Sequence, residues 1–455
     1  MTRDPYAFVP VNSVWYNHEW LWETRSWLVY ALGGGPALLI VKALCGALAF
    51  TALAWLGLRR GCDGVPLLAL LSVVAWGLGP DVHVRPYVAT YTLFPISIAL
   101  LEQGSRKALT LLAVLFVAWV NLNASFVVGL GTVFIYTLVA LLKRRPVWRS
   151  YGVLLAAMPF LVCLNPYGPA YWPFVVRAVT MPRPYITEFA PMPWALSPLR
   201  DPFLAGKLLL LVTPFLLWRR RIGWEGGALL IITAGMAMSS YRHVPLFLLA
   251  AGAYLPAALP NIKPDPRVLA AFAVAAVLWN GALLTRGLDL TVPTRPSAAA
   301  DYWFPYGAVR FMKANGLHGN IANQFDWGEF LMWEMPDCRV SFDGRLETVY
   351  PKATIDENLA FLAGKQPGLA QQWGADFVLV PFADPRGPTP LVQALMKDPF
   401  WAPLYRSDNT ALFIQSRFMR RGWIMPPQDA DAELVPLTGP PSVNMPLTGI
   451  KPAGG

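Results

Sequence analysis

Long apolar stretches dominate the chain between residues 35 and 285, and short polar or basic segments separate them. Stretches of this kind satisfy their backbone hydrogen bonds inside a bilayer when they form helices. The pattern therefore predicts a polytopic membrane protein with about ten spans. We predict spans at residues 35–58, 65–80, 87–101, 108–120, 126–142, 151–164, 203–218, 227–240, 244–258 and 268–285.

The remaining segments predict further parts of the molecule. Residues 1–34 contain NHEWLWETRSWLVYAL, which is typical of a Trp-rich helix lying along a membrane interface. Residues 165–202 form a long loop. Residues 300–420 predict an α/β domain with its own small core, and the Pro- and Gly-rich residues 421–455 predict a disordered tail.

The predicted α/β domain alternates two kinds of pattern. Helical patterns are AVRFMKANG, GEFLMWEM and LVQALMK, and strand-like runs are NIAN, RVSF, DFVLVPF and TALFIQ. The fold class predicted for the whole chain is accordingly a helical polytopic membrane protein with a C-terminal α/β domain.

Composition and charge agree with this interpretation. Of the 455 residues, 55% are hydrophobic and only 14% are charged, and the 19 Trp residues fit an interfacial aromatic belt. The formal net charge of +10 is distributed between the spans instead of gathering on one face, which argues against nucleic acid as a partner.

Basic residues alternate in number from one loop to the next. The loops after odd-numbered spans carry thirteen: Arg59, Arg60, Arg106, Lys107, Lys143, Arg144, Arg145, Arg149, Arg219, Arg220, Arg221, Lys263 and Arg267. The loops between them carry Arg85, Arg177, Arg183, Arg200 and Arg242. The positive-inside rule places the first group in the cytoplasm. An even number of spans then places both the N-terminal segment and the α/β domain outside, in a multi-pass protein.

Signatures of common soluble enzymes, such as a Walker loop, a GxSxG elbow, HExxH and CxxC, do not occur in the chain. Polar residues instead gather on the predicted outer side. They are Asp4, His18, Glu19, Lys42, Arg85, Asn121, Asn123, Glu188, Lys207, Arg242 and His243.

Cations beside carboxylates suit an anionic lipid headgroup, because the cations neutralise phosphate and a carboxylate accepts a proton from a hydroxyl. The structural alternatives are the wet face of an interfacial helix for His18 and Glu19, anchors at the lipid boundary for the cations, and helix caps or interhelical hydrogen bonds for the asparagines.

Several motifs resemble a bacterial family of membrane proteins related to the GT-C glycosyltransferases. They are RDPYAF, WYNHEWLWE, VRPY, WVNLNASFVVGL, LNPYGP, YITEFAP, SYRHVPLF and, most specifically, DWG followed by FDGR. The resemblance implies an enzyme of the bacterial inner membrane and cell envelope. Such an enzyme transfers a sugar from a polyprenyl-phosphate donor on the outer face of the membrane to an acceptor that the sequence does not identify.

Two departures from the family pattern bear on activity. Family members usually have one further span, with an acidic residue just after it, whereas this chain opens inside the first outer loop at MTRDPYAF. That leaves Glu19, ahead of Asp4, as the predicted catalytic base. In addition, the pattern resembling WxNxHG is WVNLNAS, with Asn123 where His is usual.

The remaining site residues are predicted to hold the substrate. A lipid-linked phosphate sugar would lie near Lys42, Arg85, Lys207 and Arg242. Asp343 and Arg345, in the FDGR turn, would face the membrane and close over it, the alternative being a local pair that stabilises the turn.

The sequence assigns no cofactor to this site, and it does not decide whether the site requires a divalent cation. A non-catalytic membrane scaffold, whose outer domain binds a partner or a glycan, is the second hypothesis for the protein. A transporter ranks last, because paired broken spans in two matching halves are not evident.

The charge asymmetry predicts that residues 286–455 lie outside the cytoplasm. A phosphatase reporter that is active only in the periplasm, fused after Gly455, should be active, and a reporter active only in the cytoplasm should be silent at the same position. The reverse result would contradict the topology.

Overall fold

The computed structural model describes residues 4–419 apart from 80–82, 182, 184–185, 195–200, 219–220, 260–264, 268–269, 272–273, 276, 279–303, 385–386 and 408. The predicted tail and most of the predicted span 268–285 lie outside these residues. The chain is mostly helical and divides into two compact units. His18–Val292 form a helical unit, and Met1–Asn17 together with Pro293–Gly455 form an α/β unit.

Helices of the helical unit overlap nine predicted spans, and their bounds agree to within a few residues except that α1 begins fifteen residues before the predicted start of the first span. They are α1 (Trp20–Arg59), α2 (Gly64–Leu78), α3 (Tyr87–Gln103), α4 (Arg106–Leu122), α5 (Phe126–Leu142), α6 (Trp148–Val162), α8 (Leu204–Trp218), α9 (Trp224–Ser239) and α10 (Val244–Tyr254). The sequence did not predict α7 (Tyr171–Thr180) within the long loop. Short 3₁₀ helices are η2 (Gly168–Ala170), η3 (Thr187–Phe189), η4 (Tyr241–His243) and η5 (Leu255–Ala258).

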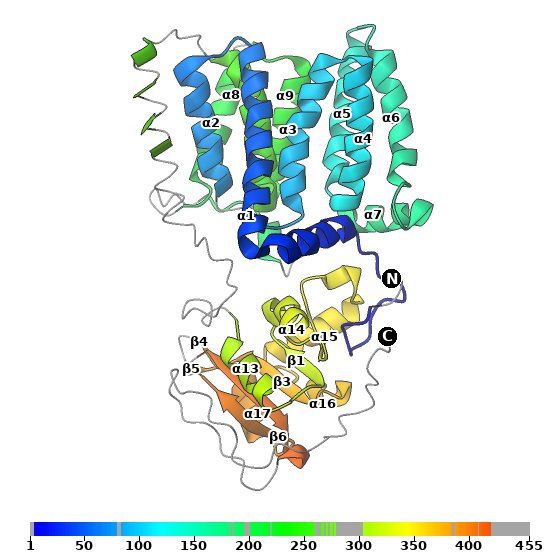
Figure 1. Ribbon diagram of the computed structural model, residues 1–455, viewed down its shortest axis with the longest axis vertical. Coiled ribbons are helices and arrows are strands. Elements are labelled where there is room, and N and C mark those ends of the chain that lie inside the picture. The colour runs from blue at the N-terminus through cyan, green and yellow to red at the C-terminus, as the bar shows by residue number, and fades with distance from the viewer. Residues whose placement is uncertain are drawn as a thin grey trace. The chain divides into compact units, whose positions relative to one another are not determined.

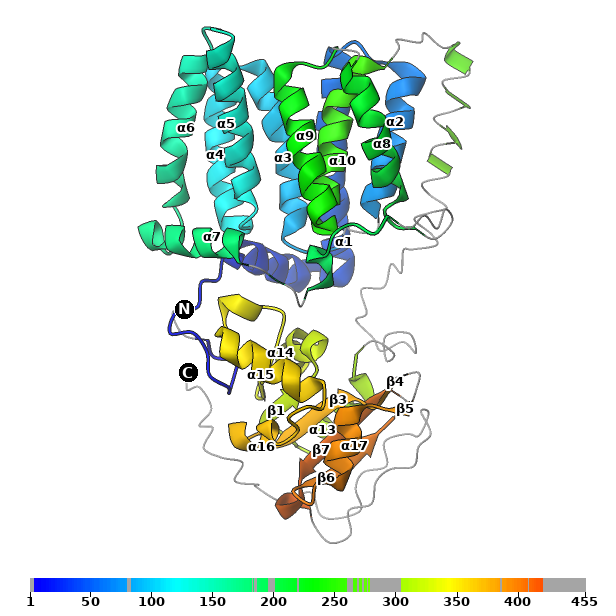
Figure 2. The same cartoon turned by 180° about the vertical axis from the view of Figure 1, so that it is seen from behind.

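Helix α1 consists of two parts that run in different directions. Its helical geometry breaks at Gly33 and Gly34, and Gly34 has φ 63° and ψ −159°, a conformation that is essentially restricted to glycine. The part before the break lies across one end of the bundle, and α7 lies across the same end (Figures 1 and 2). We call this the α7 end.

The remaining helices stand side by side and alternate in direction (Figure 1). The connections before α3, α5, α8 and α10 therefore reach the α7 end, and those after α1, α3, α5 and α8 reach the opposite end. Among the described residues, Arg60, Lys107 and Arg145, which the sequence predicted on one side of a membrane, share the opposite end of this unit.

Of the helices in the described residues, α1 is the one long and apolar enough to cross a membrane by itself. The apolar helices α2, α5, α6 and α8 have 15–17 residues. A helix rises about 1.5 Å per residue, so these span roughly 22–26 Å.

The α/β unit contains a five-stranded mixed sheet in the order β2-β1-β3-β7-β6. Strands β1, β2 and β3 are parallel, and β7 is antiparallel to both β3 and β6. The strands are β1 (Asn320–Asn323), β2 (Arg339–Val340), β3 (Phe377–Pro381), β6 (Trp401–Arg406) and β7 (Thr410–Gln415), with β4 (Ala383–Asp384) and β5 (Gly387–Pro388) as a separate pair. All four strand-like runs predicted from the sequence contain a strand.

Helices cover both faces of this sheet. They are α13 (Tyr306–Ala314), α14 (Gly328–Glu334), α15 (Lys352–Leu362), α16 (Leu369–Trp373) and α17 (Pro390–Lys397), with 3₁₀ helices η6 (Phe325–Trp327), η7 (Leu346–Thr348) and η8 (Ser416–Phe418). In β3, Phe377 and Leu379 join a core with α13 and α14, while Val378 and Val380 join a core with α15 to α17. The strand is apolar at successive positions because both faces are buried.

The segment predicted as one outer loop, residues 1–34, is divided between the two units. Its first part pairs with the edge of the sheet: Phe8 N donates to Val340 O at 3.2 Å, and Val340 N donates to Tyr6 O at 2.9 Å. Asn12 N donates to Val349 O at 2.7 Å. An edge strand exposes unpaired backbone groups, and the N-terminal segment satisfies them here.

Replacing Gly34 with Ala should destabilise the helical unit. A Cβ there would meet nothing closer than Pro36 Cδ at 3.7 Å, so the cost of about 1–3 kcal/mol comes from the backbone conformation alone. Gly46→Ala is the matched control, because Gly46 lies in the regular part of α1 with nothing within 4 Å of an added Cβ. This control should raise stability slightly in thermal unfolding. Equal effects of the two variants would contradict the prediction.

Candidate functional site

Glu19 lies at the α7 end, at the N-cap of α1. Asn123 Nδ2, just after α4, donates to Glu19 Oε1 at 2.8 Å, and His18 Nε2 lies 3.5 Å from the same oxygen. The Glu19 side chain is 29% exposed, so it is neither sealed in the protein nor fully in bulk solvent. The structure thus brings together three residues that the sequence predicted for the site.

Burial raises the pKa of the Glu19 carboxyl, and the neighbouring Glu23 raises it further. His18, Arg242 and the Asn123 hydrogen bond act in the opposite direction, but the net shift is upward. A carboxylate with a raised pKa is a stronger base when ionised.

Asn121 has a structural role next to this group. Its side chain accepts a hydrogen bond from Trp20 Nε1 at 2.9 Å and donates to Val117 O at 2.8 Å and Leu164 O at 2.9 Å. These contacts occupy its amide and join α1, α4 and the segment after α6. They support the interhelical alternative over the predicted substrate contact.

Glu188, in η3, links two predicted cations. Its Oε1 lies 3.5 Å from Arg85 Nη1, before α3, and its Oε2 lies 2.6 Å from Arg242 Nη1 in η4. Ser240 Oγ donates to the Glu188 carbonyl oxygen at 2.9 Å. The long loop is therefore attached to two neighbouring connections at the α7 end.

His243 follows Arg242 in η4. Burial lowers the pKa of its imidazole, with a smaller lowering effect from Arg242, and a hydrogen bond with the Met236 backbone opposes them. Its Nδ1 is buried and has no hydrogen-bond partner among the residues described. The neutral ring is thus favoured beside the arginine.

Lys207 does not extend toward a substrate. Its ammonium lies 2.5 Å from Asp201 Oδ2, and the two side chains are only 1% and 5% exposed. A buried pair of this kind neutralises the lysine within the fold. The predicted substrate contact of Lys207 is therefore not supported, and the sequence analysis did not single out Asp201.

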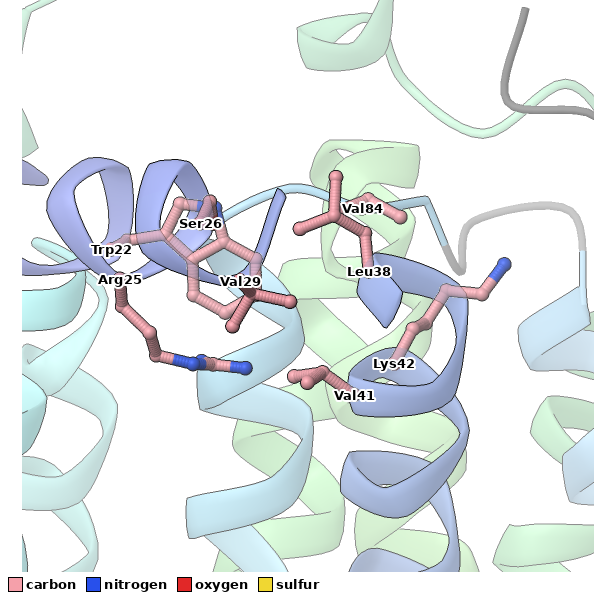
Figure 3. Close-up of a pocket in the computed structure, with 8 residues that line it drawn as sticks. All are labelled: Trp22, Arg25, Ser26, Val29, Leu38, Val41, Lys42 and Val84. Carbon is pink, nitrogen blue, oxygen red and sulfur yellow. The ribbon is translucent and has the colours of Figure 1, made fainter. Parts of the chain in front are cut away.

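Lys42 lines a small pocket that both parts of α1 form together with Val84 (Figure 3). The pocket has a volume of about 10 Å³, roughly the room that one water needs. Arg25 and Lys42 both line it, but Figure 3 shows their charged groups pointing to different sides. The pocket as it stands does not direct both cations at one anion.

Asp4, Asp343 and Arg345 form a cluster inside the α/β unit. Arg345 Nη1 lies 2.5 Å from Asp4 Oδ1, its Nη2 lies 2.8 Å from Asp343 Oδ2, and its Nε donates to Asp343 Oδ1 at 2.8 Å. Tyr6 and Trp15 contact the guanidinium at 5.2 and 4.9 Å from their ring centroids. Both aspartates are buried.

This arrangement does not support the roles predicted for the three residues. Burial acts to lower the pKa of Arg345, but its hydrogen bonds and charge interactions with Asp343 and Asp4 outweigh it, and the net shift is upward. The ion pairs occupy Asp4, so it is not available as a base. The FDGR turn holds the N-terminal segment instead of presenting Arg345 to a substrate.

Residues that the sequence analysis did not assign to the site complete its surroundings. Arg183 and Arg242 contact the Phe189 ring at 5.1 and 5.0 Å from its centroid. The Tyr171 phenol is buried without a hydrogen-bond partner in the described part of the chain, and burial, with Glu19 and Tyr167, raises its pKa. Arg183 and Phe189 lie within five positions of Glu188 in the sequence. That proximity was the one sequence feature by which these two residues could have been assigned to the site.

Among the residues that the structure describes, no group of three or more His, Cys, Asp and Glu side chains is placed to hold a metal ion. Comparison with known proteins found no family model that matches the chain and no curated protein that matches it in sequence. The arguments for function therefore depend on the residues themselves.

Arg345→Ala should destabilise the α/β unit by about 3–5 kcal/mol, because it leaves two buried carboxylates without their cation. Chemical unfolding measured by tryptophan fluorescence tests this. Lys352→Ala is the matched control, since its pair with Asp356 is largely exposed and should contribute little. If the two variants unfold at the same denaturant concentration, the structural role of Arg345 is wrong.

Proposed function

We propose that the protein is a polytopic, GT-C-like glycosyltransferase of the bacterial inner membrane. It would transfer a sugar from a polyprenyl-phosphate donor at the α7 end. The observation that carries this proposal is the half-buried Glu19 carboxylate, held by Asn123 Nδ2 at 2.8 Å, at the same end of the helical unit as Arg242. A base and a phosphate-binding cation are the two groups that the reaction requires.

Exposed apolar side chains of the helical unit support its insertion in a membrane. They include Leu44, Leu48, Val114, Phe134, Val153, Phe160, Leu211, Phe215 and Ile231, each at least half exposed. These side chains project from α1, α4, α5, α6, α8 and α9, so the apolar surface is spread over many helices. A soluble monomer rarely exposes so much apolar surface. Helices of roughly 22–26 Å are short for a hydrocarbon core of about 30 Å, which a locally thinned bilayer accommodates.

The distribution of basic residues supports an orientation in which the α7 end lies on the outer side of the membrane. Described basic residues of the predicted cytoplasmic group, such as Arg60, Lys107 and Arg145, lie at the opposite end of the helices. With that end in the cytoplasm, the chain enters α1 from outside and the α/β unit is extracytoplasmic.

The proposed reaction has a simple balance. The acceptor hydroxyl oxygen attacks the anomeric carbon of the sugar, its proton passes to Glu19, and the bond between that carbon and the phosphate oxygen breaks. The polyprenyl phosphate leaves with the bonding electron pair, and Arg242 and Arg85 stabilise its charge. Asn123 holds the Glu19 carboxylate by its hydrogen bond.

A non-catalytic scaffold that binds a partner or a glycan is the second candidate. It is favoured by the observation that Arg85, Arg242 and Lys207 each have a carboxylate partner in this structure. An assay of sugar transfer separates the two hypotheses. The protein is reconstituted in liposomes with a labelled polyprenyl-phosphate sugar. A glycosyltransferase forms a labelled product, whereas a scaffold forms none with any acceptor.

Glu19→Gln should lower the rate of sugar transfer by about 10²–10⁴-fold, the usual contribution of a general base. Glu23→Gln is the matched control, because Glu23 lies one helical turn later and is exposed. It should retain nearly full activity.

The pH dependence gives a second test of the same residue. Glu19 acts as a base only when ionised, and its pKa is raised. The rate should therefore fall as the pH drops through a value above the ordinary range of a glutamate. If the rate of the Glu19→Gln variant falls at low pH in the same way as that of the wild-type protein, the catalytic base is a residue other than Glu19.

A further inference from the structure

The phenol of Tyr171, the first residue of α7, is buried without a hydrogen bond. Its side chain is 1% exposed, and its hydroxyl has no hydrogen-bond partner among the residues that the structure describes. By contrast, the buried hydroxyls of Tyr136 and Tyr254 lie 2.8 Å apart, and the Tyr151 hydroxyl donates to Leu101 O at 2.6 Å. An unpaired buried hydroxyl is destabilising, so it needs an explanation such as a ligand or a catalytic role.

Aromatic contacts hold the Tyr171 ring in place. It stacks on Tyr167 and Phe174, with centroids 6.1 and 5.5 Å apart and interplanar angles of 22° and 20°. The ring of Phe126, the first residue of α5, lies 6.2 Å from it. Side chains packed in this way keep one rotamer, so the hydroxyl is presented at a fixed place.

The Phe174 ring connects Tyr171 with the Glu19 carboxylate. Phe174 stacks on Tyr171, and its ring centroid also lies 5.3 Å from that of His18. His18 Nε2 in turn lies 3.5 Å from Glu19 Oε1. The first turn of α7 therefore packs directly against the residue that precedes the candidate base.

A second connection runs through the start of α5. Phe126 N donates to Asn123 O at 3.3 Å, and Asn123 Nδ2 donates to Glu19 Oε1 at 2.8 Å. Burial raises the pKa of the Tyr171 phenol, and the charge of Glu19 raises it further. Two separate series of contacts thus join the unpaired phenol to the Glu19 carboxylate.

We propose that Tyr171 and Glu19 form a subsite for one hydroxyl group, which belongs to water or to an alcohol. The Tyr171 hydroxyl donates to the oxygen of this group, and the Glu19 carboxylate accepts from its hydrogen. A hydroxyl has one hydrogen and two lone pairs, so it matches a donor and an acceptor at the same time. Because the Glu19 side chain is 29% exposed and Tyr171 is buried, the hydroxyl enters from the side of Glu19.

This inference rests on the proposed function and deepens it, since the alcohol would be the acceptor of the sugar. The experiment nevertheless measures the ionisation of Glu19 without any sugar transfer. A subsite that passes this test in a protein without transferase activity would stand while the glycosyltransferase fails. Transfer by a protein in which the test fails would have the opposite meaning.

Tyr171→Phe keeps the aromatic stack and removes the hydroxyl. It should raise the pKa of Glu19 by roughly one unit, because hydrogen bonds that end on the carboxylate stabilise its ionised form. The measurement is carbon NMR of the full chain in detergent micelles, with glutamate labelled at its side-chain carboxyl and the Glu19 signal identified by its loss in Glu19→Gln. His18, Glu23 and Arg242 also influence this carboxyl, and all three remain in Tyr171→Phe.

Thermal unfolding distinguishes a ligand role of the hydroxyl from a structural one. Because the hydroxyl is unpaired within the described fold, Tyr171→Phe should retain the Tm of the wild-type protein or raise it. Tyr151→Phe is the matched control, because it removes a buried hydroxyl that donates to Leu101 O at the opposite end. This control should lower the Tm and leave the pKa of Glu19 unchanged.

Glycerol, used in excess as an alcohol probe, identifies the source of the hydroxyl. If glycerol changes the pKa of Glu19 in the wild-type protein and not in Tyr171→Phe, the subsite takes an alcohol. If the pKa rises in Tyr171→Phe and glycerol changes neither protein, the subsite takes water.

Two outcomes overturn the proposal. The first is a pKa of Glu19 that is unchanged or lower in Tyr171→Phe. The second is a loss of stability in Tyr171→Phe as large as that in Tyr151→Phe, because the hydroxyl would then have a partner within the fold.

Discussion

The break at Gly33 and Gly34 is the constraint on which the α7 end depends. Because Gly34 adopts a backbone conformation restricted to glycine, α1 changes direction there, and its first part lies across the bundle. Only in that position does Trp20 reach Asn121 and Glu19 reach Asn123. A straight α1 would carry both residues away from α4, and the candidate base would lose its partner.

Compensation of charge shapes both ends of the helical unit. At the α7 end, Glu188 bridges Arg85 and Arg242, and Asp201 neutralises the buried Lys207. At the opposite end, Glu102 pairs with Arg60, with 3.0 Å between Oε1 and Nη2, and accepts from the Tyr136 hydroxyl at 2.8 Å. The second arrangement ties helix ends together and leaves the Arg60 side chain only 13% exposed, whereas Arg85 and Arg242 remain 57% and 39% exposed. That difference in exposure is why we propose the functional site at the α7 end.

The α/β unit uses its most specific motif for folding. Arg345 pairs with Asp343 in the same turn and with Asp4 in the N-terminal segment, and its guanidinium contacts the rings of Tyr6 and Trp15. These contacts and the backbone bonds to Val340 add the N-terminal segment to the edge of the sheet. A motif that stands out in a sequence thus reflects a demanding structural position as readily as a catalytic one.

Local pattern determined much of this protein from the sequence alone. The apolar run of α5 predicted its bounds, 126–142, and the buried runs at β3 and β7 predicted strands, because these elements depend on residues within a few positions of each other. Alternating basic loops likewise predicted which connections share an end. The same pattern did not reveal α7, which has only ten residues and lies within a proline-rich loop.

Tertiary structure alone decided what the polar residues contact. Asp4 and Arg345 are 341 positions apart, and Asn121 directs its amide to backbone carbonyls instead of a ligand. Glu19 and Asn123 were both candidates in the sequence, but their hydrogen bond depends on the turn in α1 and on its packing against α4. Ion pairs and hydrogen bonds between distant segments follow from the direction and packing of whole elements, and a local pattern of residue types does not contain that information.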